Sequence, residues 1–180
     1  MSYSAFLATV ENPALRAVAE HWRKARGAKP MPSWGDLDPA AMKPHLPIIW
    51  SWKYDRISDS FTGRLAGEQI VEAFGRQLRG AAMKDFLAGR EYDTVLARFK
   101  RIVDGPAFMH CTGRVFAHAG RAGRGERIAL PLSDDGWHCS GILGATVYRV
   151  AVDDPRERPA DDLYQNQDCQ FFPLDGAAGP

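Results

Sequence analysis

The spacing of the apolar residues changes at Gly105-Pro106, and this change constrains the fold more than any other feature. Just before this point, in Glu91–Val103, the apolar side chains recur every three or four residues, which is typical of a helix with one buried face. Beyond that point they alternate with other residues, which is typical of strands. We predict three strands here, Ala107–His118, Glu126–Leu132 and Trp137–Val150. The connections are the loop 119–125 and the turn at Asp135-Gly136, so these strands should form an antiparallel meander.

Shorter elements come before the meander. The expected strands are Ile48–Tyr54 and Phe61–Ala66, and the expected helices are Glu68–Phe74, Ala81–Leu87 and Glu91–Val103. This order predicts an α+β fold, with a five-stranded antiparallel sheet and its helices on one face.

An N-terminal helix, Asn12–Arg26, is expected to flank this core. Asn12 is a good N-cap, and one face carries Leu15, Val18, Ala19 and Trp22 at helical spacing. A lone helix of about 15 residues is marginal in water, so this stripe must be covered. We expect a homodimer with Leu15, Val18 and Trp22 at or beside the contact, although the stripe could cover its own sheet instead. On the dimer hypothesis, glutamate at positions 15 and 18 gives a folded monomer.

Charge and composition exclude several classes of protein. The 180 residues include 23 basic and 22 acidic ones, and this balance argues against a nucleic-acid binder. No apolar run approaches the length of a membrane span or of a secretory signal, and no nucleic-acid or membrane partner is expected. The cysteines Cys111, Cys139 and Cys169 suggest no disulfide framework, which favours the cytoplasm.

The composition also divides the chain. Residues 151–180 contain seven acidic and two basic residues, so we expect an acidic, partly disordered tail. Its Phe171, Phe172 and Leu174 could dock on the body or on a neighbour. The expected parts are therefore a flanking helix and lead-in at 1–47, a core at 48–150 and this tail.

Several short segments, in this order, resemble a small bacterial family of PAS domains, chiefly proteobacterial and mostly single-domain. They span about Asn12 to Tyr148 and include His21-Trp22-Arg23, Met31-Pro32-Ser33, Gly63-Arg64-Leu65-Ala66-Gly67, Phe74-Gly75-Arg76 and Leu130-Pro131-Leu132-Ser133-Asp134-Asp135-Gly136. The resemblance implies a PAS fold and a sensory or protein-docking role in signal transduction. The loop 119–125 and the acidic tail depart from the family pattern.

Aromatic residues are the candidates for a ligand pocket between sheet and helices. These are Trp50, Trp52, Phe74, Phe86, Phe99 and Phe108, which could equally be ordinary core. No cofactor is predicted. The helix Glu91–Val103 lacks the histidine of a haem-binding PAS domain, and no cysteine motif for covalently linked flavin follows Phe74-Gly75-Arg76.

Other chemistry-bearing groups have structural explanations. The sequence contains two adjacent histidine–cysteine pairs, His110-Cys111 and His138-Cys139. Adjacent residues of a strand point to opposite faces, so only one member of each pair could join a common site, and no metal site is expected. Ser133-Asp134-Asp135 and His138 fit a turn better than a catalytic group, and no catalytic residue is proposed. We read the glycine–arginine segment 120–125 as a hairpin loop, although it could bind phosphate. We expect Glu126 to form a surface salt bridge with Arg64 or Arg114.

The leading hypothesis is a non-enzymatic, cytoplasmic PAS module that acts by binding a small molecule, a signalling protein partner, or both. The alternative is a small enzyme that uses the same cavity as its active site. An inward-facing acid with a raised pKa would favour that alternative.

Overall fold

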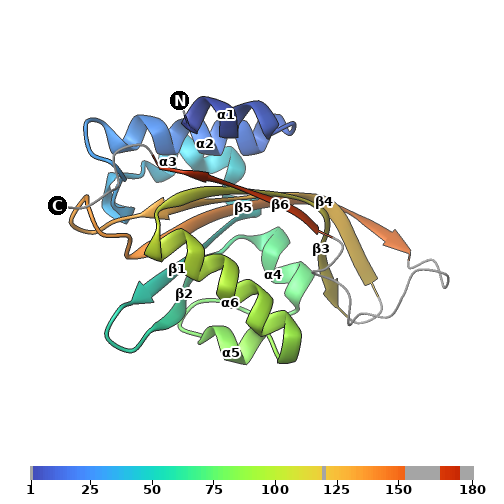
Figure 1. Cartoon of the computed structure of the whole chain (residues 1–180). Coiled ribbons are helices and arrows are strands. Elements are labelled where there is room, and N and C mark those ends of the chain that lie inside the picture. Colours follow the sequence, from blue (N-terminus) through green and yellow to red (C-terminus); the bar gives the residue numbers. More distant parts are fainter. Residues whose placement is uncertain (1, 119–120, 153–166, 175–180) are drawn as a thin grey trace.

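A six-stranded antiparallel sheet forms the centre of the molecule (Figure 1). The structure is a computed structural model that describes residues 2–118, 121–152 and 167–174. The strands lie in the order β2-β1-β5-β4-β3-β6. Their bounds are β1 Ile49–Asp55, β2 Ser60–Ala66, β3 Ala107–His118, β4 Arg121–Leu132, β5 Gly141–Val152 and β6 Gln167–Pro173. The predicted α+β class is confirmed, with one strand more than expected.

Helices cover both faces of this sheet, as Figure 1 shows. One face, here called the outer face, carries α1 Ser2–Thr9, α2 Pro13–Arg26 and α3 Pro39–Met42. The opposite, inner face carries α4 Glu68–Phe74, α5 Met83–Phe86 and α6 Gly89–Asp104. Two 3-10 turns, Trp34–Asp36 and Lys43–Ile48, lead from α2 to β1. The expected helix cluster and flanking helix are thus confirmed, and α1 is an additional element.

The flanking helix α2 begins and ends as its sequence predicts. The side chain of Asn12 accepts a hydrogen bond from the backbone of Ala14, and Gly27 closes the helix with a positive φ of 55°. Its stripe is completely buried within a single chain. Trp22 Nε1 donates to the carbonyl of Pro131 at 2.7 Å, and its ring packs edge-on against Phe108.

This burial corrects the expected dimer contact. Leu15, Val18 and Trp22 have no exposed surface in one chain, so a second subunit cannot reach them. The stripe covers its own sheet because a six-stranded sheet with helices on one face would leave its other face open. A homodimer whose contact lies beside these residues stays a prediction.

The glycine–arginine segment belongs mostly to a strand, so the predicted hairpin loop is wrong for residues 121–125. Arg124 pairs with Arg114 of β3 on one side and with Arg149 of β5 on the other. Two long neighbouring strands supply backbone partners throughout this segment, which outweighs the weak strand preference of glycine. Residues 119 and 120 lie outside the described residues. At the next connection, β5 begins at Gly141, later than the Trp137 that alternation suggested.

Part of the acidic tail forms strand β6, which pairs along β3 at the edge of the sheet. Cys169 of β6 lies directly opposite Cys111 of β3, and the two form a disulfide. The expectation that the cysteines form no disulfide is therefore wrong, because Cys169 lies in a strand that the tail's composition concealed. The cysteines therefore no longer support the expected location in the cytoplasm. Residues 153–166 and 175–180, which make up the rest of the predicted tail, lie outside the described residues.

No helix among the described residues is long and apolar enough to cross a membrane.

Candidate functional site

A cavity of about 60 Å³ lies between the inner face of the sheet and helices α4–α6. Five of the six aromatic residues predicted for a pocket line it, namely Trp50, Trp52, Phe74, Phe86 and Phe99. Trp50 stacks on Phe99 of α6 with ring centroids 5.6 Å apart, and Trp52 meets Phe86 of α5 edge-on at 6.2 Å. Aromatic side chains from the sheet and from its helical cover therefore form a large part of the cavity wall.

Phe108, the sixth predicted residue, lies on the outer face and does not line the cavity. It is buried against Phe6, Tyr3 and Trp22, with the Phe6 and Phe108 rings stacked at 5.0 Å. Alternate residues of a strand point to opposite faces, and Phe108 shares the outer face with His110. Its assignment to the pocket is wrong because both faces of this sheet bury aromatic residues.

Arg127 of β4 brings a positive charge to the cavity wall. Its Nε donates to Thr146 Oγ1 at 3.1 Å, and its terminal nitrogen donates to the carbonyl of Val115 at 2.5 Å. Trp50 Nε1 donates to the same threonine oxygen at 2.9 Å. Space for the indole depends on Gly144, because a Cβ there would lie 2.1 Å from a ring carbon of Trp50. Sequence reasoning identified Trp50 but missed Arg127 and Thr146, since neither residue belongs to a recognisable motif.

Arg76 joins two of the helices that close the cavity. It follows α4, and its guanidinium donates to the carbonyls of Asp85 at 2.5 Å and Phe86 at 3.4 Å. The same guanidinium lies 4.6 Å from the centre of the Phe86 ring. A volume of about 60 Å³ holds only about four to six water molecules. A larger molecule would need more space than this cavity offers, and Arg76 bridges the α4 and α5 side of its wall.

The polar groups of the cavity are guanidinium and hydroxyl groups. Arg76, Arg127, Thr146 and Tyr148 contribute them, and the described lining residues include no carboxylate, imidazole or thiol. The inward-facing carboxylic acid that would favour the enzyme hypothesis is therefore not found among these described residues.

On the opposite face of β4, Glu126 holds the beginning of α2. Its two carboxylate oxygens accept the backbone N–H groups of Glu11 and Asn12, each at 2.8 Å. His110 Nε2 also bonds Oε1 at 2.8 Å, and both side chains are buried. The predicted salt bridge with Arg64 or Arg114 is wrong, because position 126 faces α2 and its N–H groups attract a carboxylate.

Replacing Glu126 with glutamine should destabilise the protein by about 1.5–3 kcal/mol. The amide oxygen can accept only one of the two backbone N–H groups by a charge-free hydrogen bond, and the amide NH₂ faces the other N–H, which is also a donor. Urea denaturation measures this change. Glu72→Gln, at an exposed position of α4, is the matched control and should change stability by less than about 0.5 kcal/mol. Equal stability of the two variants would contradict the role given to Glu126.

The other candidate groups do not gather into a catalytic or metal site. Ser133 and His138 both bond the carboxylate of Asp135, at 2.9 and 2.7 Å, within one turn. These bonds, that of His138 foremost, hold the pKa of Asp135 well below its ordinary value. Cys139 is buried, and desolvation raises the pKa of its thiol to about 11. Within the described ranges, no three histidine, cysteine or acidic residues converge as metal ligands do.

A family model described as PAS domain matches residues 10–147. The chain belongs to the PAS domain family. The match includes α2, the outer-face contact at Glu126 and the lining residues of the inner cavity except Tyr148, and it ends before β6. No curated protein and no solved structure matches this chain. PAS domains are in general sensory and signalling modules, so the resemblance seen in the short motifs is confirmed at the level of the family.

Proposed function

We propose that this PAS module senses a small molecule in the inner cavity and signals its presence through the flanking helices to a protein partner. The supporting observation is the position of two consecutive residues. Arg127 lines the cavity, and its neighbour Glu126 holds the beginning of α2 on the opposite face. A displacement of β4 at the cavity would therefore move the attachment point of α2 as well.

The chemistry of the cavity favours a compact ligand with an apolar or aromatic body and one carboxylate or carbonyl group. Aromatic and aliphatic side chains form most of the wall, and the aromatic ones would stack on such a body. Arg76 and Arg127 make the cavity positive, and a guanidinium binds carboxylates through directed hydrogen bonds. Because the cavity is small, binding of such a ligand would widen it at the wall that Arg76 spans.

Signal transfer would take place by contact on the outer face, and we propose that the partner recognises the surface of α1 and α2. Helix α2 carries basic residues in its last turn, Arg23, Lys24 and Arg26, beside fully buried residues that anchor it. A shift of this helix would change the surface offered to a partner without unfolding the sheet. Action in the cytoplasm and as a homodimer are parts of the same proposal.

Native mass spectrometry of the freshly purified protein tests the proposal, since it reports both a retained molecule and the number of subunits. We expect a retained small molecule or, failing that, binding of added benzoate, the probe chosen for its aromatic ring and single carboxylate. A protein that carries no molecule and does not bind benzoate would contradict ligand sensing at this cavity.

Replacing Arg127 with methionine should weaken benzoate binding by about 10- to 100-fold, because the charge-assisted hydrogen bonds are lost while the apolar stem is kept. Calorimetric titration measures the affinity, and circular dichroism checks that the variant is folded. Arg90→Met, at an exposed position of α6, is the control and should bind as the unmodified protein does. Equal affinity in Arg127→Met and Arg90→Met would exclude Arg127 from the binding site.

A further inference from the structure

Strand β6 contacts the helices of both faces from the edge of the sheet. On the outer face, Phe172 meets Phe6 of α1 with ring centroids 5.9 Å apart, and Ser2 donates a hydrogen bond to the carbonyl of Pro173. On the inner face, the guanidinium of Arg101 in α6 lies 4.1 Å from the centre of the Phe171 ring. The position of β6 therefore affects both α1 and α6.

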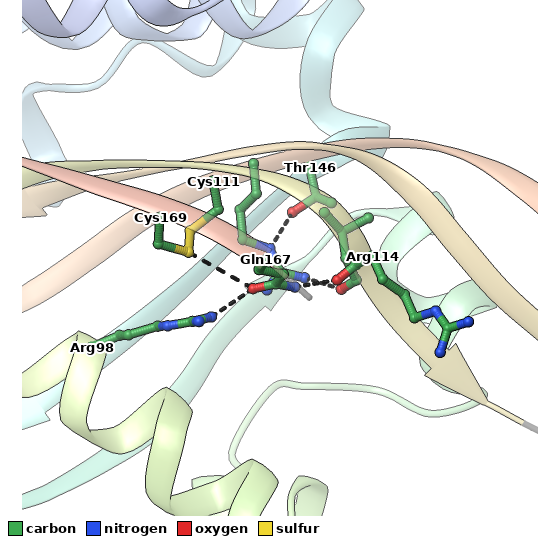
Figure 2. Close-up of a disulfide and its surroundings, with 8 residues drawn as sticks. Arg98, Cys111, Arg114, Thr146, Gln167 and Cys169 are labelled. Atoms are coloured by element: carbon green, nitrogen blue, oxygen red, sulfur yellow. Dashed lines mark hydrogen bonds between the residues drawn. A yellow bond between two sulfur atoms is a disulfide. The ribbon is translucent and has the colours of Figure 1, made fainter. Parts of the chain in front are cut away.

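Gln167 adds a polar attachment at the beginning of β6. Its amide nitrogen donates to the carbonyl of Arg114, and its oxygen accepts from Arg98 of α6 at 2.5 Å (Figure 2). The Sγ of Cys169 lies 3.9 Å from the same amide oxygen. The disulfide therefore lies beside the attachment of β6 to α6.

The disulfide is the covalent part of this attachment. In the described part of the sheet β6 pairs with β3 alone, over seven residues. The bond between Cys111 and Cys169 links positions 58 residues apart, and the intervening chain contains β4 and β5. A cross-link over such a separation greatly reduces the freedom of the detached strand. Without it, a short edge strand must keep its place by non-covalent contacts.

We propose that Cys111 and Cys169 are a redox-active pair, and that their reduction by a cellular dithiol releases β6 from β3. Cys169 is partly exposed on the edge strand, whereas Cys111 is completely buried in β3. An incoming thiolate therefore attacks the Sγ of Cys169. Arg98, which shares the Gln167 oxygen with this sulfur, places a positive charge near the thiolates that the exchange produces.

The exchange balances with a dithiol as reductant. Its first thiolate bonds to the Sγ of Cys169 as the Cys111–Cys169 bond breaks, and Cys111 leaves as a thiolate that takes up a proton. The second thiol of the reductant then loses its proton and attacks the reductant's first sulfur, which is bonded to Cys169 in the mixed disulfide. This step releases Cys169 as a thiolate, which takes up a proton. The pair thereby gains two electrons and two protons, and the reductant becomes a disulfide.

Release of β6 would uncover the edge of β3 and remove contacts from α1 and α6 together. This inference goes beyond ligand sensing and does not depend on it, because none of the residues named for the exchange lines the cavity. The buried Cys139 takes no part, since its raised pKa keeps it as a thiol and its Sγ bonds the carbonyl of Gly141.

Hydrogen–deuterium exchange on the full chain, with and without excess dithiothreitol, tests the proposal. We expect reduction to speed exchange in residues 167–174 by about a hundred- to a thousandfold, as loss of a cross-link over this separation implies, and exchange in β1 to stay unchanged. Reoxidation should restore the slow exchange. In a separate sample that stays reduced, iodoacetamide should label Cys111 and Cys169 and leave Cys139 unlabelled.

Two variants complete the experiment. Cys169→Ser should exchange rapidly at 167–174 without reductant, and Cys139→Ser should respond to dithiothreitol as the unmodified protein does. A disulfide that survives dithiothreitol until the whole protein unfolds would overturn the proposal. It would also be overturned by a reduced protein in which residues 167–174 exchange as slowly as before.

Discussion

Replacing Leu15 with glutamate is expected to abolish the native fold. Leu15 is completely buried between α2 and the sheet, so the new carboxylate would lose its water within an apolar layer. An isolated buried charge costs several kcal/mol, a large part of the 5–15 kcal/mol that holds a typical domain together. Circular dichroism during heating should show the loss of a cooperative transition.

Ile57→Glu provides the matched control for this substitution. Ile57 lies in the turn between β1 and β2 with 99% of its surface exposed, and its replacement should leave the transition within about 0.5 kcal/mol of the original. A Leu15→Glu protein that stays folded and becomes monomeric would instead restore the dimer contact that the sequence suggested.

Replacing Trp22 with alanine should lower the free energy of unfolding by about 3–5 kcal/mol. The change removes the large ring between α2 and Phe108 and takes a hydrogen bond from the carbonyl of Pro131. Urea denaturation measures the loss. The free energy of unfolding of Trp22→Phe should lie between those of the unmodified protein and of Trp22→Ala. This variant keeps an aromatic ring but leaves the Pro131 carbonyl without the indole donor.

Trp137→Ala is the control for Trp22. Its side chain is 62% exposed, so the same loss of an indole should cost less than about 0.5 kcal/mol. Similar effects of the two alanine variants would contradict the packing described for α2.

Local sequence signals predicted the elements and much of the cavity. The stripe of α2, the glycines that end helices and the alternation after Pro106 each reflect a short-range rule, and the structure follows them. Trp50 and Phe99 were identified because large aromatic residues in a sheet and in its covering helix tend to meet. Neighbouring residues alone therefore predicted the type of most elements, but not α1, β6 or the strand at residues 121–125.

The errors concern relations between distant residues. Phe108 was assigned to the pocket because alternation separates the two faces of a strand without saying which face meets which helix. Glu126 binds the backbone N–H groups of Glu11 and Asn12 at the beginning of α2, which lie 115 and 114 residues earlier in the chain. The pairing of Cys111 with Cys169 depends in the same way on where an edge strand returns to the sheet.

The contacts between α1 and β6 join residues up to 171 positions apart, and this has a consequence for synthesis on the ribosome. Phe6 is completely buried in the folded protein, and its partner Phe172 is added to the growing chain long after it. Until then α1 lacks the cover of β6, and only Phe108 of β3 is available to stack on Phe6. We expect a nascent chain stalled before β6 to depend on chaperones that cover apolar surface, and one stalled after it to be largely independent of them.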